Sequence, residues 1–565
     1  MRMRHIGPAA GIAAGVAALV AANALTSAAA ATSRRGDGPG GGGHGHIAHV
    51  LLISVDGLHQ QDLAWYTRTH PGSALAKLVR GGVEYSRAQT PVPSDSFPGM
   101  VGQVTGGDPK VTGIYYDDTW NHGVFPAGTT DCRGPVPGGE VSYTEAADVN
   151  QQSIDAGQGL SGLPGSILQM TSNPLDVINP AALPVGPATC KPIYPNRYLK
   201  VNTIFEIARQ HGLRTAWSDK HPAYQALSGP SGAGVEDYFT PEINSQAIGF
   251  PAGQDWTKDN AATMQYDSYK VQAILNGVDG FDHSRAHHAG VPAIFGMNFQ
   301  TVSTAQKLPV SGGLTGGYLP GGSVPGPLLA RALGYINTEI GAMAGEIEAQ
   351  GLAGSTAIII SAKHGQSPTD PRDLVRVPDG PIISAINAAW TALHPGAGDL
   401  VIFSTDDDGM LLWLSDRSQA AAGFVRHYLL THTAAGNDIN GDPVTVAASG
   451  LRTVYAGTAA AAYFGVPAGD PRHPDVFGIV RHGIVYTGGK GKIAEHGGAG
   501  QQDRNVPILV VLPGLSHGHG IAAPVTTTQI APTILKLLGL DPAALQAVRI
   551  EHTKVLPGLR GNAGR

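Results

Sequence analysis

Lysine, histidine and carboxylate side chains stand in this sequence at points where apolar stretches end. The apolar run at 358–360 leads into Lys363 and His364, which a glycine follows. An apolar run that stops at polar residues and glycine is typical of a buried strand that ends in a loop. In open α/β sheets, ligands bind just beyond the carboxyl ends of such strands. We therefore expect a positive charge and an imidazole at a ligand-binding edge.

Four other polar residues also stand where an apolar stretch ends: Asp56, Asp219, Asn298 and Gln300. A single residue of this kind is most simply explained as a loop cap or turn former. Several carboxylate, amide and imidazole groups gathered at one sheet edge can instead hold a divalent metal ion. His221, two residues after Asp219, is a possible additional ligand, although a turn also explains this pair.

A serine in a proline-rich stretch at 90–100 is the candidate nucleophile. Ser94 and Ser96 both lie there, ahead of a predicted helix. A hydroxyl at a helix start can cap the helix. It can also attack a substrate, provided that a base or a metal stabilises its alkoxide. The positive end of the helix would favour an anionic group such as phosphate.

The elements that must position these residues alternate along the chain. Strand patterns lie at 49–58, 291–300, 409–416, 475–489 and 506–514, and a further strand ends at Asp219. Helical patterns lie at 73–82, from 199 to Gly212, at 328–351 and at 526–540. This alternation predicts an α/β fold with a largely parallel sheet, helices on both faces and loop-rich insertions.

The N-terminal residues differ in composition from the rest. A basic start, an apolar stretch and a group of small residues predict a signal peptide over 1–31, with a retained membrane anchor as the alternative. A glycine-rich linker follows at 32–46. We expect one domain over 47–565, with insertions near 115–198 and 370–475, and a secreted or extracytoplasmic protein.

Bulk composition excludes some classes of protein. Apolar residues make up 42% of the chain and charged residues 14%, with a net charge of −6. A nucleic-acid-binding protein would normally carry a basic patch or arm, and none is visible. The chain has only two cysteines, Cys132 and Cys190. In an exported protein they are expected to form a disulfide, and two free buried thiols are the alternative.

Five motifs in order resemble the alkaline-phosphatase superfamily, and within it the type I phosphodiesterase and nucleotide pyrophosphatase family. The motifs are "LLISVDGL" at 51–58, "PSDSFPGM" at 93–100, "KHGQ" at 363–366, "EHGG" at 495–498 and "TTTQIAPTILKLLGLDP" at 526–542. The resemblance implies the superfamily fold and a nucleophile at Ser96. It also implies metal ligation by Asp56, His364 and His496, with Gln300 at a further ligand position.

The family uses two zinc ions to orient the nucleophile and neutralise phosphoryl oxygens. This chain departs from that pattern at three kinds of position. Lys363 stands where the family has an aspartate, Gln300 and Thr304 stand where it has an aspartate and a histidine, and Gly99 replaces an asparagine. A protonated lysine cannot bind a metal. One divalent ion, zinc by the resemblance, is therefore easier to accommodate here than two.

Lys363 is the departure with the clearest chemical consequence. Our hypothesis is that its ammonium group replaces part of one metal's charge and stabilises phosphoryl oxygens or the Ser96 alkoxide. The alternatives are a decayed site and an ion pair with a carboxylate such as Asp56.

The sequence thus predicts a secreted phosphoric ester hydrolase that acts on a small phosphoester or nucleotide. No membrane span is expected beyond the signal segment, and the oligomeric state is left open. A secreted binding protein that keeps the fold without catalysis is the alternative function.

Overall fold

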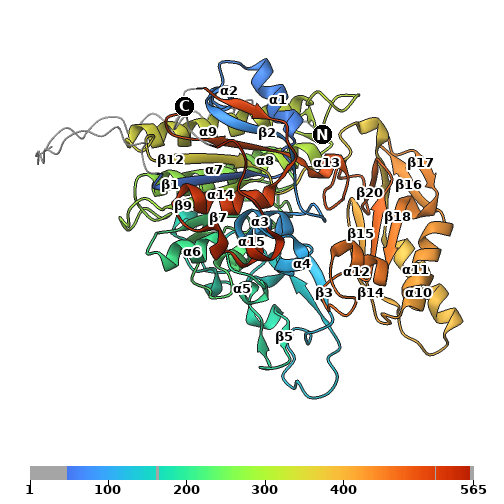
Figure 1. The fold of residues 1–565 in the computed structure, drawn as a ribbon. Helices are drawn as coiled ribbons and strands as arrows, with labels where there is room; N and C mark the ends of the chain where they lie inside the picture. The colour runs from blue at the N-terminus through green and yellow to red at the C-terminus, as the bar shows by residue number, and fades with distance from the viewer. Residues whose placement is uncertain (1–46, 161–164, 516, 560–565) are drawn as a thin grey trace, which may run out of the picture. The chain divides into compact units, whose positions relative to one another are not determined.

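A nine-stranded sheet forms the centre of the fold. Several of its strands, among them β1, β2, β7, β9 and β12, are labelled in Figure 1. The computed structural model of the chain describes residues 47–160, 165–515 and 517–559. The predicted signal peptide and linker therefore lie outside the described residues. The strand order is β22-β2-β21-β12-β1-β9-β7-β8, and β23 pairs with β2. These strands are β1 (His49–Val55), β2 (Gly82–Gln89), β7 (Ala216–Ser218), β8 (Asp237–Phe239), β9 (Ile294–Phe299), β12 (Thr356–Ser361), β21 (Asn505–Val511), β22 (His519–Ile521) and β23 (Val525–Thr526).

The register of the parallel strands brings the polar residues together. Strand β1 lies between β12 and β9 and is parallel to both, with Ser54 opposite Ser361 on one side and Asn298 on the other. Two residues further along, Asp56, Lys363 and Gln300 leave their strands at the same edge. Strand β7 is parallel to β9, so Asp219 also reaches that edge. Only β21 runs antiparallel to its neighbours among the described strands of this sheet.

Helices cover both faces of the sheet because its central strands are apolar on both sides. In β1, Val50 and Leu52 belong to one core, and Leu51 and Ile53 belong to the other. The first core includes residues of α3 (Ser96–Thr105), α6 (Ile204–Gln210) and α14 (Ile530–Leu537). The second includes residues of α7 (Asn260–Val278), α8 (Thr301–Lys307) and α9 (Pro327–Ala349). The predicted fold class is confirmed.

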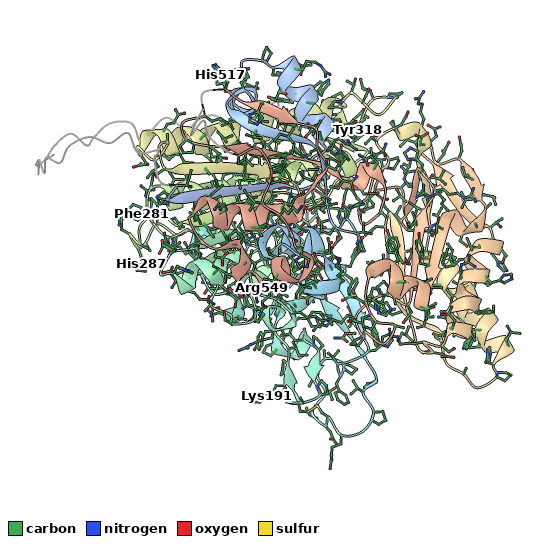
Figure 2. All side chains as sticks on the ribbon, viewed as in Figure 1. Lys191, Phe281, His287, Tyr318, His517 and Arg549 are labelled. Atoms are coloured by element: carbon green, nitrogen blue, oxygen red, sulfur yellow. A yellow bond between two sulfur atoms is a disulfide. The ribbon has the colours of Figure 1, made fainter. Side chains whose placement is uncertain are left out.

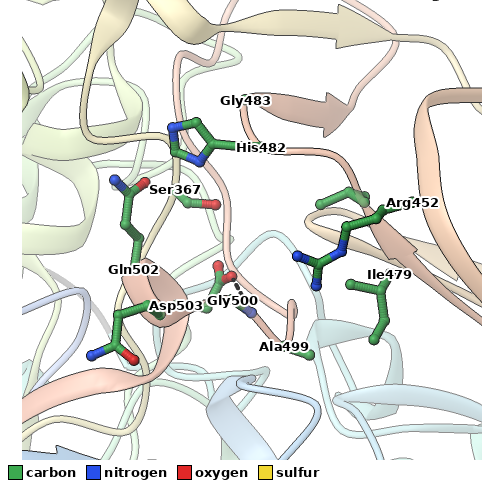
Figure 3. Close-up of a pocket in the computed structure, with 11 residues that line it drawn as sticks. Ser367, Arg452, Ile479, His482, Gly483, Ala499, Gly500, Gln502 and Asp503 are labelled. Atoms are coloured by element: carbon green, nitrogen blue, oxygen red, sulfur yellow. Dashed lines mark hydrogen bonds between the residues drawn. The ribbon is translucent and has the colours of Figure 1, made fainter.

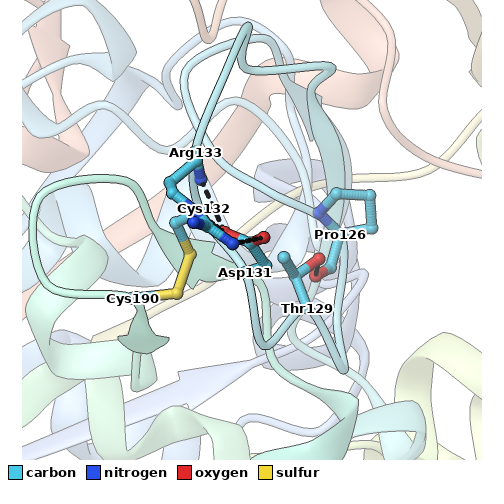
Figure 4. The surroundings of a disulfide bond; sticks show 6 residues. All are labelled: Pro126, Thr129, Asp131, Cys132, Arg133 and Cys190. Carbon is cyan, nitrogen blue, oxygen red and sulfur yellow. Dashed lines mark hydrogen bonds and ion pairs between the residues drawn. A yellow bond between two sulfur atoms is a disulfide. The ribbon is translucent and has the colours of Figure 1, made fainter.

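The described residues between 115 and 198 form short strands, short helices and turns. They contain the pairs β3 (Asp118–Asn121) with β4 (Gly139–Ser142) and β5 (Val185–Gly186) with β6 (Lys191–Pro192). The predicted disulfide is confirmed, because Cys132 and Cys190 are bonded with an S–S distance of 2.08 Å (Figure 4). It joins two chain segments 58 residues apart within this block.

Residues 375–486 form two further four-stranded sheets, of which sequence patterns predicted only part. One sheet has the order β17-β16-β13-β20 and the other β14-β15-β19-β18. Their strands are β13 (Val375–Val377), β14 (Val401–Asp406), β15 (Gly409–Leu414), β16 (Ala434–Asp438), β17 (Pro443–Val446), β18 (Leu451–Ala456), β19 (Val476–Val480) and β20 (Ile484–Tyr486). Strands such as β16, "AAGND", lack the apolar alternation that identifies a strand.

No helix in the described part of the chain is both long and apolar enough to cross a membrane.

Candidate active site

Asp56 is the centre of the polar group at the sheet edge, and it is almost fully buried. Asn298 donates a hydrogen bond to its Oδ1 at 2.5 Å, and Gln300 donates to its Oδ2 at 2.6 Å. Two ammonium groups, those of Lys363 and Lys220, each lie 3.6 Å from one of its oxygens. Burial alone would raise the pKa of Asp56. The neighbouring Lys363, His364 and Lys220 outweigh that effect and hold its pKa well below the ordinary value.

Ser96 is the first residue of α3, and its hydroxyl contacts an imidazole. Its Oγ lies 3.2 Å from Nε2 of His364. Nδ1 of His364 is 2.9 Å from the carbonyl oxygen of Gly365, which can only accept a hydrogen bond. A neutral His364 therefore carries its proton on Nδ1, and its unprotonated Nε2 faces the serine hydroxyl. The pair has the hydrogen-bond arrangement of a nucleophile and its general base.

Lys220 is a second residue that contacts the Ser96 hydroxyl, and the sequence analysis did not assign it a role. Its Nζ donates a hydrogen bond of 2.9 Å to Ser96 Oγ. Its side chain is 12% exposed, whereas Ser96 is fully buried. Lys220 follows Asp219 directly at the end of β7, so its position after an apolar strand was the available signal. A cation in this position stabilises negative charge on the serine oxygen.

Lys363 is used differently from our hypothesis. Its fully buried ammonium donates to Tyr224 Oη at 2.7 Å and to Asp219 Oδ1 at 3.2 Å, and it also pairs with Asp56. No hydrogen bond joins Lys363 to Ser96 among the described residues. The structure thus contains the ion pair that we considered as the alternative. The cation that contacts the serine is Lys220.

His496 lies beside His364 and faces a carboxylate. The two imidazole rings have centroids 3.9 Å apart. Nδ1 of His496 is 3.2 Å from Oδ1 of Asp95, the residue that caps α3. Burial lowers the pKa of His496 well below its ordinary value, and His364 and Lys307 lower it further. His496 is therefore a neutral imidazole at neutral pH.

The predicted metal ligands do not fit a metal ion at Asp56. The Asp56 carboxylate already accepts two amide hydrogen bonds and is flanked by two ammonium groups, which would repel a cation. Gln300 turns its amide nitrogen toward Asp56, although ligation would need its carbonyl oxygen. Asp56, His364 and His496 do not form a group of three converging ligand atoms; within the described ranges only Glu145, His221 and Glu242 do.

The predicted additional ligands Asp219 and His221 point to different partners. Asp219 accepts hydrogen bonds from Trp217 Nε1 and from Lys363. His221 Nδ1 lies 2.8 Å from Glu242 Oε2, so it belongs to a neighbouring buried acidic group. Asp219 therefore pairs with Lys363, whereas the His221 side chain contacts Glu242 instead.

A cavity of about 380 Å³ lies near α13 (Gln501–Arg504) and is separate from this group (Figure 3). Arg452, His482, Gln502 and Asp503 are among the residues that line it. None of the predicted site residues lines this cavity. One hydrogen bond joins the cavity lining to the segment that precedes Ser96, because the Ser94 hydroxyl donates to the carbonyl oxygen of Asp503.

Comparison with known proteins identifies the family. Residues 50–500 match the family described as type I phosphodiesterase / nucleotide pyrophosphatase. A search of curated protein sequences finds no match.

Solved structures with a similar fold are alkaline phosphatases and pyrophosphatases. Wild-type alkaline phosphatase PafA is similar with a TM-score of 0.55 and 13% identity, over 88% of this chain and 96% of that one. Murine ectonucleotide pyrophosphatase/phosphodiesterase 5 is similar with a TM-score of 0.51 and 11% identity, over 87% and 96%. An inactive variant of the murine protein, in complex with AMP, has a TM-score of 0.52 at 11% identity, again over 87% and 96%. At these identities the likeness concerns the fold.

The family match covers most of the chain and includes Asp56, Ser96, Lys363, His364 and His496. The chain therefore belongs to the type I phosphodiesterase and nucleotide pyrophosphatase family and is a hydrolase that acts on phosphoric ester bonds.

Proposed function

We propose that this protein cleaves phosphoric esters through a covalent intermediate on Ser96, with lysine charges in place of metal ions. The proposal rests on two contacts of the Ser96 hydroxyl oxygen. Ser96 Oγ lies 2.9 Å from Lys220 Nζ and 3.2 Å from His364 Nε2. A base and a cation at one hydroxyl are what a serine needs to become a nucleophile.

In the first step, His364 Nε2 accepts the proton of Ser96 while Oγ attacks phosphorus. The bond from phosphorus to the leaving oxygen breaks, the leaving oxygen takes the proton from His364, and the phosphoryl group stays on Ser96. Lys220 stabilises negative charge on the serine and phosphoryl oxygens. In the second step, water attacks phosphorus and gives a proton to the neutral His364, which passes it to Ser96 Oγ as the bond between phosphorus and the serine breaks.

Positioning and charge stabilisation account for most of the catalysis of phosphoryl transfer. The buried pairs that Lys363 forms with Asp56 and Asp219 support positioning, because they join the residues that follow β12, β1 and β7. The start of α3 adds the positive end of a helix next to Ser96. We assign no step to a divalent ion at Asp56, zinc included, because the donors around that carboxylate do not fit one.

The substrate that we propose is a small phosphodiester or nucleotide. The family match supports this class, and so does the murine structural neighbour, whose inactive variant binds AMP. We further infer that the protein is exported, which the basic and apolar composition of residues 1–31 supports.

The test is hydrolysis of chromogenic phosphate mono- and diesters by Ser96→Ala. We expect turnover to fall by at least about a thousandfold. Mass spectrometry of wild-type protein quenched during turnover should find the phosphoryl or phosphodiester adduct on the peptide that contains Ser96. Retained turnover without the hydroxyl would exclude this serine as the nucleophile.

Ser361→Ala is a matched control. The Ser361 hydroxyl is also buried, on the neighbouring strand β12, and it has no hydrogen-bond partner among the described residues. Its removal should leave turnover unchanged. A similar loss in both variants would indicate a general effect on folding.

A further inference from the structure

A buried acidic group next to the proposed active site contains a histidine and has no lysine or arginine partner. Ligand atoms of Glu145, His221 and Glu242 all lie within 4.8 Å of one another. His221 and Glu242 are buried, at 3% and 0% exposure, and Glu145 is partly exposed. In the described part of the chain, no lysine or arginine forms an ion pair with Glu145 or Glu242.

A third carboxylate, that of Asp148, lies next to this group. Asp148 is only 3% exposed, and neither of its oxygens has a hydrogen-bond partner among the described residues. Its carboxyl faces those of Glu242 and Glu145. Buried polar atoms are nearly always hydrogen-bonded, so a buried carboxylate without such a partner beside other carboxylates is stabilised by a shared proton or by a bound cation.

We propose that Glu145, Asp148, His221 and Glu242 bind one divalent cation. An imidazole among carboxylates suits zinc or manganese, whereas calcium and magnesium take oxygen ligands. The ion would take the place of the hydrogen bond between His221 Nδ1 and Glu242, and the neutral imidazole would then carry its proton on Nε2. Glu145, the most exposed of the four, marks the side from which an ion can enter.

Three different segments supply these ligands. Glu145 and Asp148 come from the loop-rich block at 115–198, His221 follows β7, and Glu242 follows β8. Hydrogen bonds already join these segments, since Asn244 donates to Glu145 through its side chain and to Glu242 through its backbone. A bound ion would therefore attach the loop-rich block to the sheet edge.

The ion would also act next to the catalytic group, because His221 follows Lys220. Fixing His221 would restrict the backbone that presents Lys220 to Ser96. This consequence rests on the proposed function, whereas the binding site itself does not.

The test is metal binding to the full chain after chelation, with Zn²⁺ and Mn²⁺ as the probes. Calorimetry, Mn²⁺ electron paramagnetic resonance and metal analysis should find one ion per chain. Glu145→Gln, Asp148→Asn and Glu242→Gln should each weaken binding at least tenfold. Glu236→Gln, at an exposed ion pair with Arg209, should not.

Absence of stoichiometric binding, or binding that these three variants leave unchanged, would overturn the proposal. Glu145 is the least buried ligand, so Glu145→Gln remains informative if the other variants fold poorly. None of these measurements depends on hydrolysis. A protein that binds the ion but hydrolyses nothing would contradict the proposed function and leave the ion site intact.

Discussion

The ammonium of Lys220 lies 2.9 Å from the hydroxyl of Ser96, and the same ammonium lies 3.6 Å from Asp56. One lysine thus links the nucleophile to the carboxylate that the superfamily resemblance assigns to a metal. This relationship explains how a chain that lacks several family ligands can still supply positive charge at the serine. It also separates the roles of the two lysines at this edge of the sheet.

Replacing Lys220 by methionine should lower kcat about a hundredfold to a thousandfold, because one charged donor to the reacting oxygens is lost. KM should change less. Steady-state kinetics with a chromogenic diester measures both constants. Lys200→Met, which removes an ion pair with Asp470, is the control and should retain wild-type kcat. Undiminished kcat in Lys220→Met would refute the role of this lysine.

Gly99 should tolerate no side chain, although related proteins have asparagine there by resemblance. A Cβ on Gly99 would lie 2.1 Å from the carbonyl oxygen of Lys363, so α3 packs directly on the backbone that carries the lysine. Gly99→Ala should reduce the free energy of unfolding by about 1–3 kcal/mol through overpacking. Urea unfolding measures this change.

The control for Gly99 is Gly345→Ala in α9. A Cβ at Gly345 meets no atom within 4 Å, so the helix propensity of alanine should stabilise the protein by about 1 kcal/mol. If Gly99→Ala were equally stabilising, the close approach of α3 to Lys363 would be incorrect.

A second buried ion pair should stabilise the start of α8, where Gln300 donates a hydrogen bond to Asp56. Asp267 and Lys270 are both fully buried and 3.1 Å apart, and Asp267 also accepts hydrogen bonds from the backbone of Gln300 and Thr301. Asp267→Asn leaves the ammonium unpaired, and it should cost about 3–5 kcal/mol of unfolding free energy. Lys258→Ala, at an exposed pair with Asp255, should change stability by less than about 1 kcal/mol. Equal effects of the two substitutions in urea unfolding would argue against a buried pair.

His283 should make stability depend on pH. Its Nδ1 lies 2.5 Å from Asp237 Oδ1 and its Nε2 lies 2.7 Å from the Met170 carbonyl oxygen. Burial alone would lower the pKa of His283, but these two acceptors outweigh burial and raise it. A raised pKa in the folded state stabilises the protein fully below the unfolded value of about 6.5, and this contribution is lost as pH rises through the folded pKa.

The free energy of unfolding of the wild type should therefore exceed that of His283→Gln most at pH 6, and the difference should narrow toward pH 9. Urea titrations at several pH values measure it. His287 is exposed in the same loop and is labelled in Figure 2, so His287→Gln should produce no such trend. A difference between wild type and His283→Gln that stays constant with pH would show that the imidazole is not charged in the folded protein.

The central sheet could be predicted from sequence because its strands are strongly apolar and end abruptly. Strands β1, β9 and β12 are continuous apolar runs, and their polar ends include Asp56, Gln300 and Lys363. The disulfide followed from the presence of only two cysteines. The sheets at 375–486 were largely missed because several of their strands are short and only partly apolar.

The sequence by itself determined which residues reach the edge of the sheet, since strand ends and motif order are local properties. Only the tertiary structure decided which charges meet there. Side-chain direction and strand register place Lys220 on Ser96, Lys363 on Asp219 and His221 on Glu242. The partners are 124, 144 and 21 residues apart along the chain, so no local pattern reveals them. At distances of a few ångströms, the sign and position of each charge determine whether an anion or a metal ion can bind.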